Sequence, residues 1–392
     1  MRISKSTGWK MVFIRELRRM VSRPVYVIIT IVLPFIFLLF FGTFMQEGMP
    51  ERLPIGIIDH DFSTLSRNFI RQIDATQQTK CVSYYQQFSE ARSAMQEGHI
   101  YGFIEFPSHM QKDIMAGHQP KVNFYYNQSY LVAGSLSLKN LSTMFNTLSG
   151  GVNLETRLAK GQNEKESMGQ IQPISPEIHA IGNPYTNYSI YLVNILLPAM
   201  LELIILLTTV YCIGIELKKS SSPKWLRYAG GSFFQALVGK MLPYTIIFSS
   251  MAILYDVFLY KFMQFPLNNS IIWIFLASVL LVLTSQTIGI IMIGAFPTLK
   301  DSMNFAGLYG ILAFSYSGLI YPIEGMPIFL QGLSLAFPIR FFFKIYQCVA
   351  INSFTPVYSI PDYLYMLVFL VLPIIIWKRL RKAVIELNYP KV

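Results

Sequence analysis

Charged residues are scarce in this chain: only 14% of its 392 residues are Asp, Glu, Lys or Arg, whereas 53% are hydrophobic. Soluble domains carry about 25% charged residues, so the deficit argues against a soluble globular protein. Cysteine is also scarce. Because Cys81, Cys212 and Cys348 show neither paired nor metal-ligand spacing, the sequence indicates no disulfide framework and no zinc site.

The chain also lacks a phosphate-binding loop. A Walker A motif requires GxxxxGK[ST], whose backbone N–H groups hold phosphate. The nearest stretch, Gly239-Lys240-Met241, lacks both the upstream glycine at the right spacing and the hydroxyl residue. We therefore expect no cofactor in this chain, and any ATP that drives it must be hydrolysed by another chain.

The histidines indicate neither a catalytic nor a metal site. Only His60 has acidic neighbours, Asp59 and Asp61, at the end of a predicted strand. A solvated loop explains this group, because a metal site would need a further ligand that only the fold can supply. We predict no catalytic residue and no metal ligand.

Long apolar runs are what the chain does contain. A helix needs about 20 apolar residues to cross the hydrocarbon core of a bilayer. Two of the runs carry one acidic residue each, Glu202 and Asp256, and the shortest run can extend because flanking Lys378 and Arg379 can snorkel to the interface. The six predicted spans are Val25–Phe44, Ser189–Ile215, Met241–Tyr260, Ile271–Phe296, Met303–Tyr321 and Tyr363–Trp377.

A seventh apolar stretch, Met326–Ile351, is interrupted by Pro338, Arg340 and Lys344. A span here would also place the basic residues after position 377 on the opposite side from the other basic segments. We expect instead a pair of short helices over residues 322–351 that dip into the membrane from the outer face and return.

Between the first and second spans lies a mostly polar insert. Its predicted strands alternate with helices, which is typical of a small α/β domain with a mixed or parallel sheet. A long helical pattern over Tyr130–Lys160 suggests a stalk, and the polar Gly161–Ile181 suggests a linker. The predicted strands are Leu53–Asp59, Val82–Tyr85, Tyr101–Phe106 and Val122–Tyr126.

Charge sets the expected orientation. Met1–Pro24 has seven basic residues against one acidic, Gly214–Lys240 five against one and Lys378–Val392 five against one, whereas Gln46–Asn187 has eleven against thirteen. The positive-inside rule therefore predicts cytoplasmic termini and an extracytoplasmic insert. The same topology accounts for the net charge of +11, so we expect contact with membrane lipid and no nucleic-acid partner.

The predicted fold class is an α-helical polytopic membrane protein with six transmembrane helices and an inserted α/β extracytoplasmic domain. The predicted parts are residues 1–24, a cytoplasmic interfacial helix; 25–45, the first transmembrane helix; 46–187, the α/β domain with its stalk; 188–380, the second to sixth transmembrane helices with a cytoplasmic loop at 214–240; and 381–392, a cytoplasmic tail.

The N-terminal segment has helical periodicity with an apolar and a basic side. Its apolar side comprises Trp9, Val12, Phe13, Leu17 and Met20, and its basic side comprises Arg15, Arg18, Arg19 and Arg23, with Glu16 at the boundary. This pattern predicts a helix that lies in the cytoplasmic interface and ends at Pro24. The alternative is an ordinary basic flank.

The loop at 214–240 is the best candidate for contact with a soluble partner. A short, partly apolar helix with orienting charges would give such a partner a firm handle, with Trp225 and Leu226 as the buried anchor. The alternative is a floppy basic loop. The residues predicted to contribute are Glu216, Lys218, Lys219, Pro223, Lys224, Trp225, Leu226 and Arg227.

Glu202 lies near the centre of its span, and intramembrane charge is costly. It is a candidate to line a transport pathway or to meet a partner helix. The alternative is a protonated or hydrogen-bonded structural carboxyl.

Four stretches together resemble the ABC-2 type export permeases, in particular the bacterial branch with a large extracytoplasmic domain after the first span. RELRRMVSRP is similar to the start of that family's elbow helix, and GLIYPIEGMPIFLQGLSLAFPIRFF to its outer re-entrant hairpin. LPIGIIDHDFSTLSRNFIRQI and GHIYGFIEFPSHMQKDI resemble the opening strand–helix units of its external domain. The hairpin residues are Pro322, Glu324, Met326, Pro327, Pro338 and Arg340.

One stretch departs from the family. Many members carry Arg-Glu-x-Gly-Thr in the cytoplasmic loop, where this chain has Ile215-Glu216-Leu217-Lys218-Lys219. Glu216 matches and the Gly-Thr pair does not.

The resemblance implies a permease subunit in the bacterial inner membrane that exports a drug-like, lipidic or other amphiphilic substrate. A second permease subunit, identical or a paralogue, would complete the pathway, and two cytoplasmic ATP-binding cassette subunits would supply ATP and Mg. Some members of this branch also work with a periplasmic adaptor and an outer-membrane channel. The alternatives from other classes are a membrane-anchored sensor or secretion accessory protein with an external ligand-binding domain, and a secondary transporter.

Overall fold

The computed structural model describes residues 8–46, 48–172, 182–183, 187–318, 320–352 and 354–386. The chain divides into two compact units. One, here called the helical unit, comprises Met1–Gly48 and Ala180–Val392; the other, the α/β unit, comprises Met49–His179.

Within the described residues, five helices of the helical unit are long and apolar enough to cross a membrane, or six if one bent pair counts as a span. Two of them widen locally into π-helical turns, at Ile28–Val32 and Phe258–Phe262. The five are Pro24–Phe44 (α2 Pro24–Val27 and α3 Leu33–Phe44 around the first π turn), α9 Tyr188–Lys218, Phe233–Phe262 (α11 Phe233–Val257 and the second π turn), α12 Ile271–Ala295, and Pro356–Glu386 with α16 Ile360–Val371 and α17 Pro373–Glu386.

The predicted span Met303–Tyr321 corresponds to α13, which runs over Leu299–Ser315 and has 17 residues. It begins earlier than predicted because Lys300 and Asp301 fit into its first turn. It ends earlier because the chain turns at Gly318, whose φ of 86° is left-handed. The helix packs along α9 and α12. A count of six membrane spans therefore stays a prediction.

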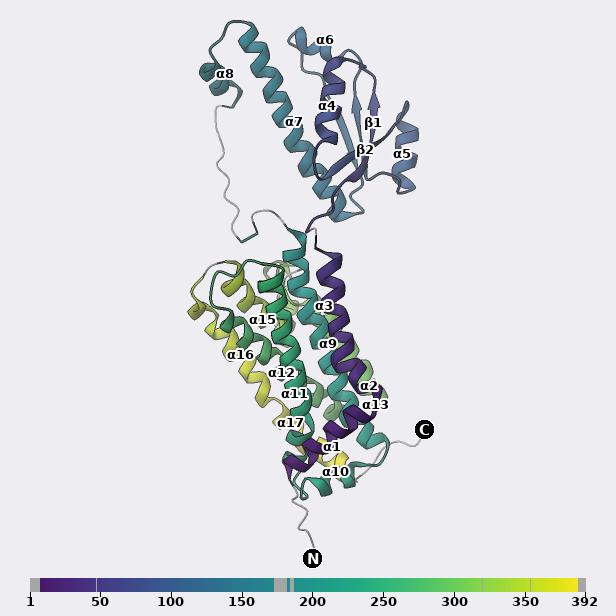
Figure 1. Cartoon of the computed structure of the whole chain (residues 1–392), viewed down its shortest axis with the longest axis vertical. Coiled ribbons are helices and arrows are strands. Elements are labelled where there is room, and N and C mark those ends of the chain that lie inside the picture. Colours follow the sequence, from purple (N-terminus) through teal and green to yellow (C-terminus); the bar gives the residue numbers. More distant parts are fainter. Residues whose placement is uncertain are drawn as a thin grey trace, which may run out of the picture. The chain divides into compact units, whose positions relative to one another are not determined.

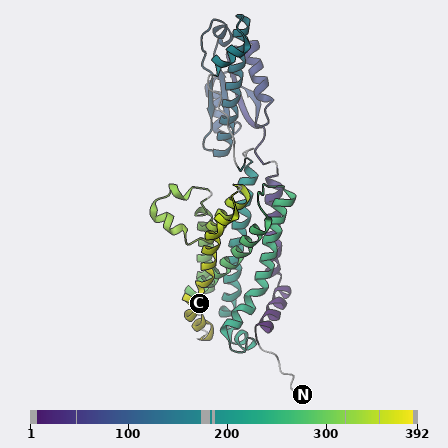
Figure 2. The ribbon, with the colours of Figure 1, turned by 90° about the vertical axis from the view of Figure 1, so that its left-hand side faces the viewer.

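The predicted hairpin at 322–351 consists of short helices, and its two main parts are bent by 87° relative to each other. Arg340 stabilises the bend, because its guanidinium donates to Gln331 O at 3.3 Å and to Ser334 Oγ. Figure 2 shows the first part, in lime green, standing away from the other helices of the helical unit. The elements are η3 Ile323–Gly325, α14 Ile328–Ser334, α15 Pro338–Tyr346 and η4 Gln347–Ile351.

Two short helices meet at one end of the helical unit (Figure 1). The N-terminal helix α1 spans Trp9–Ser22, after which Arg23 has extended backbone and Pro24 begins the first long helix. The second short helix, α10, spans Ser222–Tyr228 and follows the end of α9 after a turn. The last long helix, α17, also contacts α10.

The α/β unit is built on a four-stranded sheet of order β2-β1-β3-β4. β1 pairs in parallel with β2 and β3, and β4 closes the sheet antiparallel to β3. The strands alternate with helices along the chain, and β1 has the predicted bounds. The elements are β1 Leu53–Asp59, α4 Thr64–Asp74, β2 Thr79–Tyr84, α5 Phe88–Gln96, β3 Gly102–Phe106, α6 Met110–Met115, β4 Asn123–Tyr126, α7 Leu131–Ala159 and α8 Glu164–Ile171.

Both faces of the sheet are covered. α4 and α7 pack on one face over Ile55, Ile57 and Ile104, and α5 packs on the other over Ile58 and Phe103 (Figure 1). The parallel strands are therefore buried on both sides, which agrees with their apolar sequences.

The predicted linker Gly161–Ile181 contains a short helix, α8, at Glu164–Ile171. Asn163 caps this helix by accepting a hydrogen bond from Lys165 N. Residues 173–181 of the predicted linker lie outside the described residues.

Candidate functional site

The helix α1 is attached to the helical unit by a narrow buried face. Val12, Glu16 and Met20 are buried at four-residue intervals. The helix lies very close to α11, since a Cβ added at Gly239 would be 2.4 Å from Trp9 O. At its start, Gly8 N donates to Tyr228 O at 2.9 Å, which links α1 to α10.

This buried face differs from the predicted apolar side. Trp9 is 42% exposed and Leu17 37%, whereas Glu16, which was expected at the boundary, lies at the centre of the buried stripe. The physical reason is that Glu16 has a buried cationic partner, so its burial is compensated.

That partner is Lys240 of α11, whose Nζ is 2.8 Å from Glu16 Oε1 and 3.1 Å from Glu216 Oε1. All three side chains have no exposed surface. Glu216, in the last turn of α9, also accepts from Arg15 Nη2 at 2.7 Å and from Arg19. We call Arg15, Glu16, Arg19, Glu216 and Lys240 the ionic cluster; it joins α1, α9 and α11.

Within the ionic cluster, the burial of each charge is compensated by opposite charges. Three cations face two carboxylates, and a buried charge is tolerated when it is paired and hydrogen-bonded. Burial alone would lower the pKa of Arg19, but the carboxylates of Glu216 and Glu16 outweigh it and hold that pKa above its ordinary value. Arg15 and Arg19 are half-buried, so the ionic cluster extends from the interior to the surface through these two side chains.

α10 covers the ionic cluster. Its indole, Trp225, is fully buried, donates from Nε1 to Ala236 O at 3.0 Å and lies 5.1 Å from Lys240 Nζ, within cation–π distance. Just before α10, Ser221 Oγ donates to Glu216 Oε2 and Ser221 N to Glu216 O at 2.9 Å. The polypeptide from the end of α9 into α10 is therefore bound directly to the ionic cluster.

The residues predicted for partner contact fall into two groups. Glu216 and Trp225 face the interior, and Leu226 is half-buried. The others form an exposed basic surface around α10, here called the α10 surface: Lys218, Lys219, Pro223, Lys224 and Arg227. A protein that docks on this chain would contact the second group and not the indole.

Among the residues predicted for the N-terminal helix, the structure brings Arg15 and Arg19 into the ionic cluster. Arg18 and Trp9 are exposed, and Phe13 is half-buried. Their predicted position at a membrane interface stays a prediction.

Sequence reasoning missed Glu16, Lys240 and Ser221 as members of the site. Two signals were available. Glu16 continues the four-residue spacing of Val12 and Met20, and Lys240 is the one charge inside the apolar face of α11 at its start. A lone acid and a lone base in two apolar stripes are complementary, although nothing in the sequence shows that they meet.

Glu202 belongs to the same helix as Glu216 but not to the ionic cluster. The two are fourteen residues apart, which is about 21 Å along a helix. Glu202 is buried, and its Oε1 has no hydrogen-bond partner among the described residues. Its role as a pathway residue stays a prediction, as do those of the hairpin residues.

Within the described residues, no group of three or more His, Cys, Asp or Glu side chains is arranged to hold a metal ion.

The long apolar helices define a polytopic membrane protein. The ionic cluster joins the ends of two of them, α9 and α11, to the short helix α1. A family model described as ABC-2 family transporter protein matches residues 24–378. The chain therefore belongs to the ABC-2 transporter family, as its motifs predicted. Among curated proteins, none matches the chain.

Proposed function

We propose that this chain is the membrane-spanning permease subunit of an ATP-driven exporter, and that an ATP-binding cassette subunit docks on the α10 surface. The observation that carries this proposal is the ionic cluster. It connects α10 through Ser221 and Trp225 to the ends of α9 and α11 and to α1. A force applied to α10 would thus reach two long helices at once.

The mechanism follows from the cost of separating buried charges. Pulling Lys240 away from Glu16 or Glu216 would leave a buried charge without its partner, which costs several kcal/mol. The ends of α9, α11 and α1 therefore move together with α10 when the partner's ATP-binding sites close. The ATP and Mg belong to the partner, and this chain supplies the mechanical connection.

The charge distribution supports the orientation that the mechanism needs. The basic segments that contain α1, α10 and the end of α17 would be cytoplasmic, and residues 46–187 extracytoplasmic. We further propose a location in the bacterial inner membrane, a second permease subunit across the pathway, and an amphiphilic substrate. We also propose a periplasmic adaptor and an outer-membrane channel as further partners of the α/β unit.

The test uses the charges of the α10 surface. Lys224 and Arg227 are exposed and belong to no part of the ionic cluster. In the full chain co-expressed with its candidate ATPase, Lys224→Glu with Arg227→Glu should weaken co-purification and reduce transport-coupled ATP hydrolysis at least tenfold, because two attractive contacts become repulsive.

A matched control reverses two exposed lysines of the α/β unit, Lys112→Glu with Lys165→Glu, and should leave both readouts unchanged. If the α10 variant binds the ATPase and supports transport as the unmodified chain does, the proposed docking surface is wrong.

A further inference from the structure

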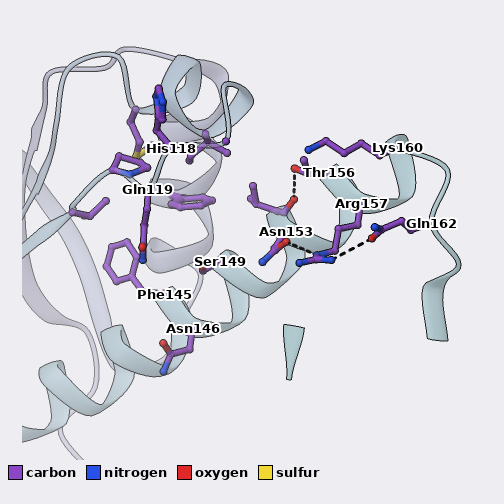
Figure 3. A pocket seen from close by; sticks show the side chains of 17 residues that line it. His118, Gln119, Phe145, Asn146, Ser149, Asn153, Thr156, Arg157, Lys160 and Gln162 are labelled. Carbon is purple, nitrogen blue, oxygen red and sulfur yellow. Dashed lines mark hydrogen bonds between the residues drawn. The ribbon is translucent and has the colours of Figure 1, made fainter. Parts of the chain in front are cut away.

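The α/β unit contains a groove of about 780 Å³ between α7, α6 and the loop at residues 117–122. Figure 3 shows His118, Gln119 and Phe145 on one side of it and the last turns of α7 on the other. Its volume lies within the range of small-molecule sites. We call it the α6–α7 groove.

The floor of the α6–α7 groove is apolar. Phe69 and Met110 are buried, and Ile114, Phe145 and Val152 are half-buried. These side chains form the edge of the core that α4, α6 and α7 build over the sheet. An apolar surface left open to water at this position favours an apolar ligand.

One end of the groove carries positive charge that no acidic side chain of the described residues neutralises. Arg157 and Lys160 line it from the last turn of α7, near Asn153 and Gln162 (Figure 3). Arg157 donates to the neutral side chains of Asn153, at 3.0 Å, Gln162, at 3.3 Å, and Gln170. No acidic side chain of the described residues lines the groove, and none forms an ion pair with either cation.

We propose that the α6–α7 groove binds a single amphiphilic anion, with its apolar part over Phe145 and its acid group at Arg157 and Lys160. A carboxylate, sulfate or phosphate would serve, because its charge-assisted hydrogen bonds to the guanidinium are stronger than those of the neutral amide oxygens that Arg157 contacts. The groove is a concavity in the α/β unit, so its ligand would be a single molecule that has left the bilayer and not the bilayer surface. This site goes beyond the permease function and does not depend on ATP coupling.

The experiment uses the full chain in nanodiscs of zwitterionic phosphatidylcholine and a long-chain carboxylate that carries a photoactivatable diazirine. After illumination, mass spectrometry locates the labelled peptides. Labelling should fall on residues 110–122 and 145–162. Dodecyl sulfate should compete, whereas dodecanol and dodecyltrimethylammonium should not.

Two kinds of variant separate the acid-group contact from the apolar contact. Arg157→Gln with Lys160→Gln should reduce groove labelling about tenfold, the effect of about 1.4 kcal/mol, and Arg157→Lys should retain most of it. The matched control is Lys112→Gln with Lys165→Gln. Ser149→Trp, which fills the groove, should also abolish labelling, whereas Ser142→Trp, on an exposed part of α7 outside the lining, should not.

Three results would each overturn the proposal: groove labelling that the alcohol competes as well as the sulfate, labelling unchanged in the Arg157/Lys160 double variant, or labels confined to the long apolar helices. The last would indicate partition of the probe into the bilayer. Failure here leaves the docking test on α10 unaffected, because that test has a separate readout.

Discussion

At position 240 a lysine without any exposed surface holds two carboxylates from different helices within 3.1 Å of its Nζ. Hydrophobic residues of similar size would often stabilise a fold equally well, so a buried ionic cluster is weak evidence for stability alone. Its distinctive property is that it fixes geometry, because the ion pairs form only when α1, α9 and α11 are in one relative position.

The first prediction concerns Lys240. Lys240→Met keeps most of the length of the side chain but removes the closest cation of Glu16, which is left with longer contacts to Arg15 and Arg19, at 3.6 and 3.7 Å. Weakening the pairing of a buried carboxylate in this way should cost about 3 to 5 kcal/mol. The thermal unfolding midpoint of the detergent-solubilised chain should fall, whereas Lys219→Met, at an exposed position, should leave it unchanged.

A second substitution shows that charge is the cause. Adding Glu16→Gln to Lys240→Met removes the carboxylate that lost its closest cation, so part of the lost stability should return. If Lys240→Met alone melts like the unmodified chain, the charges of the ionic cluster do not hold the helices together.

The residues of the site were only partly predictable. Glu216 was found because it stands in a basic segment between spans, and Arg15 and Arg19 because they share a helix face with other arginines. Glu16 and Lys240 could not be found by periodicity, which weighs apolar residues and treats a charge in an apolar stripe as a boundary. Their partnership exists only in the folded chain.

Among the elements, α1 and α11 lie in close contact at Gly239. A side chain here would meet the backbone of α1, because the added Cβ would be 2.4 Å from Trp9 O and 2.8 Å from Val12 Cβ. The glycine thus permits the contact on which the salt bridge between Glu16 and Lys240 depends.

Gly239→Ala should therefore displace α1 and destabilise the chain by about 1 to 3 kcal/mol, the usual cost of overpacking, despite the better helix propensity of alanine. Gly151→Ala in α7, where a Cβ would meet nothing within 4 Å, should be neutral or slightly stabilising. Thermal midpoints measure both, and proteolysis between residues 9 and 22 reports whether α1 has detached. Equal midpoints for the two variants would contradict the close approach.

The regular elements were more predictable than the site. β1 has the predicted bounds because its apolar run is closed by Asp59, and α4 begins after Ser63, whose side chain accepts from Ser66 N. The helix α8 was missed because it is almost wholly polar, so its sequence has no apolar stripe to show the helical period. For α13, the uncharged run of nineteen residues, Met303–Tyr321, did not predict the bounds of the helix, which spans Leu299–Ser315.

For the whole molecule, the central prediction is that the α/β unit is extracytoplasmic and the α10 surface cytoplasmic. Thr143→Cys lies on an exposed part of α7, and Lys219→Cys on the α10 surface. In a Cys348→Ser background, a membrane-impermeant maleimide added to spheroplasts should label the first and not the second. Permeabilisation should expose the second. Labelling of Lys219→Cys in intact spheroplasts would reverse the proposed topology.

The native thiols will not obscure that result. Burial, with a smaller effect of Asp74, raises the pKa of Cys81 to about 12, so this thiol is protonated at neutral pH and a poor nucleophile. Cys212 is fully buried. Labelling should therefore report the introduced cysteines alone.

The pairing of Glu16 with Lys240 has a consequence for how the chain is made. The two residues are 224 positions apart, so a ribosome completes α1 long before it begins α11. α1 can pack on α11 only after the first long helix, the α/β unit and α9 have all been synthesised. Attachment of α1 is thus a late step in biogenesis, and chains truncated before residue 240 should keep this helix accessible to protease.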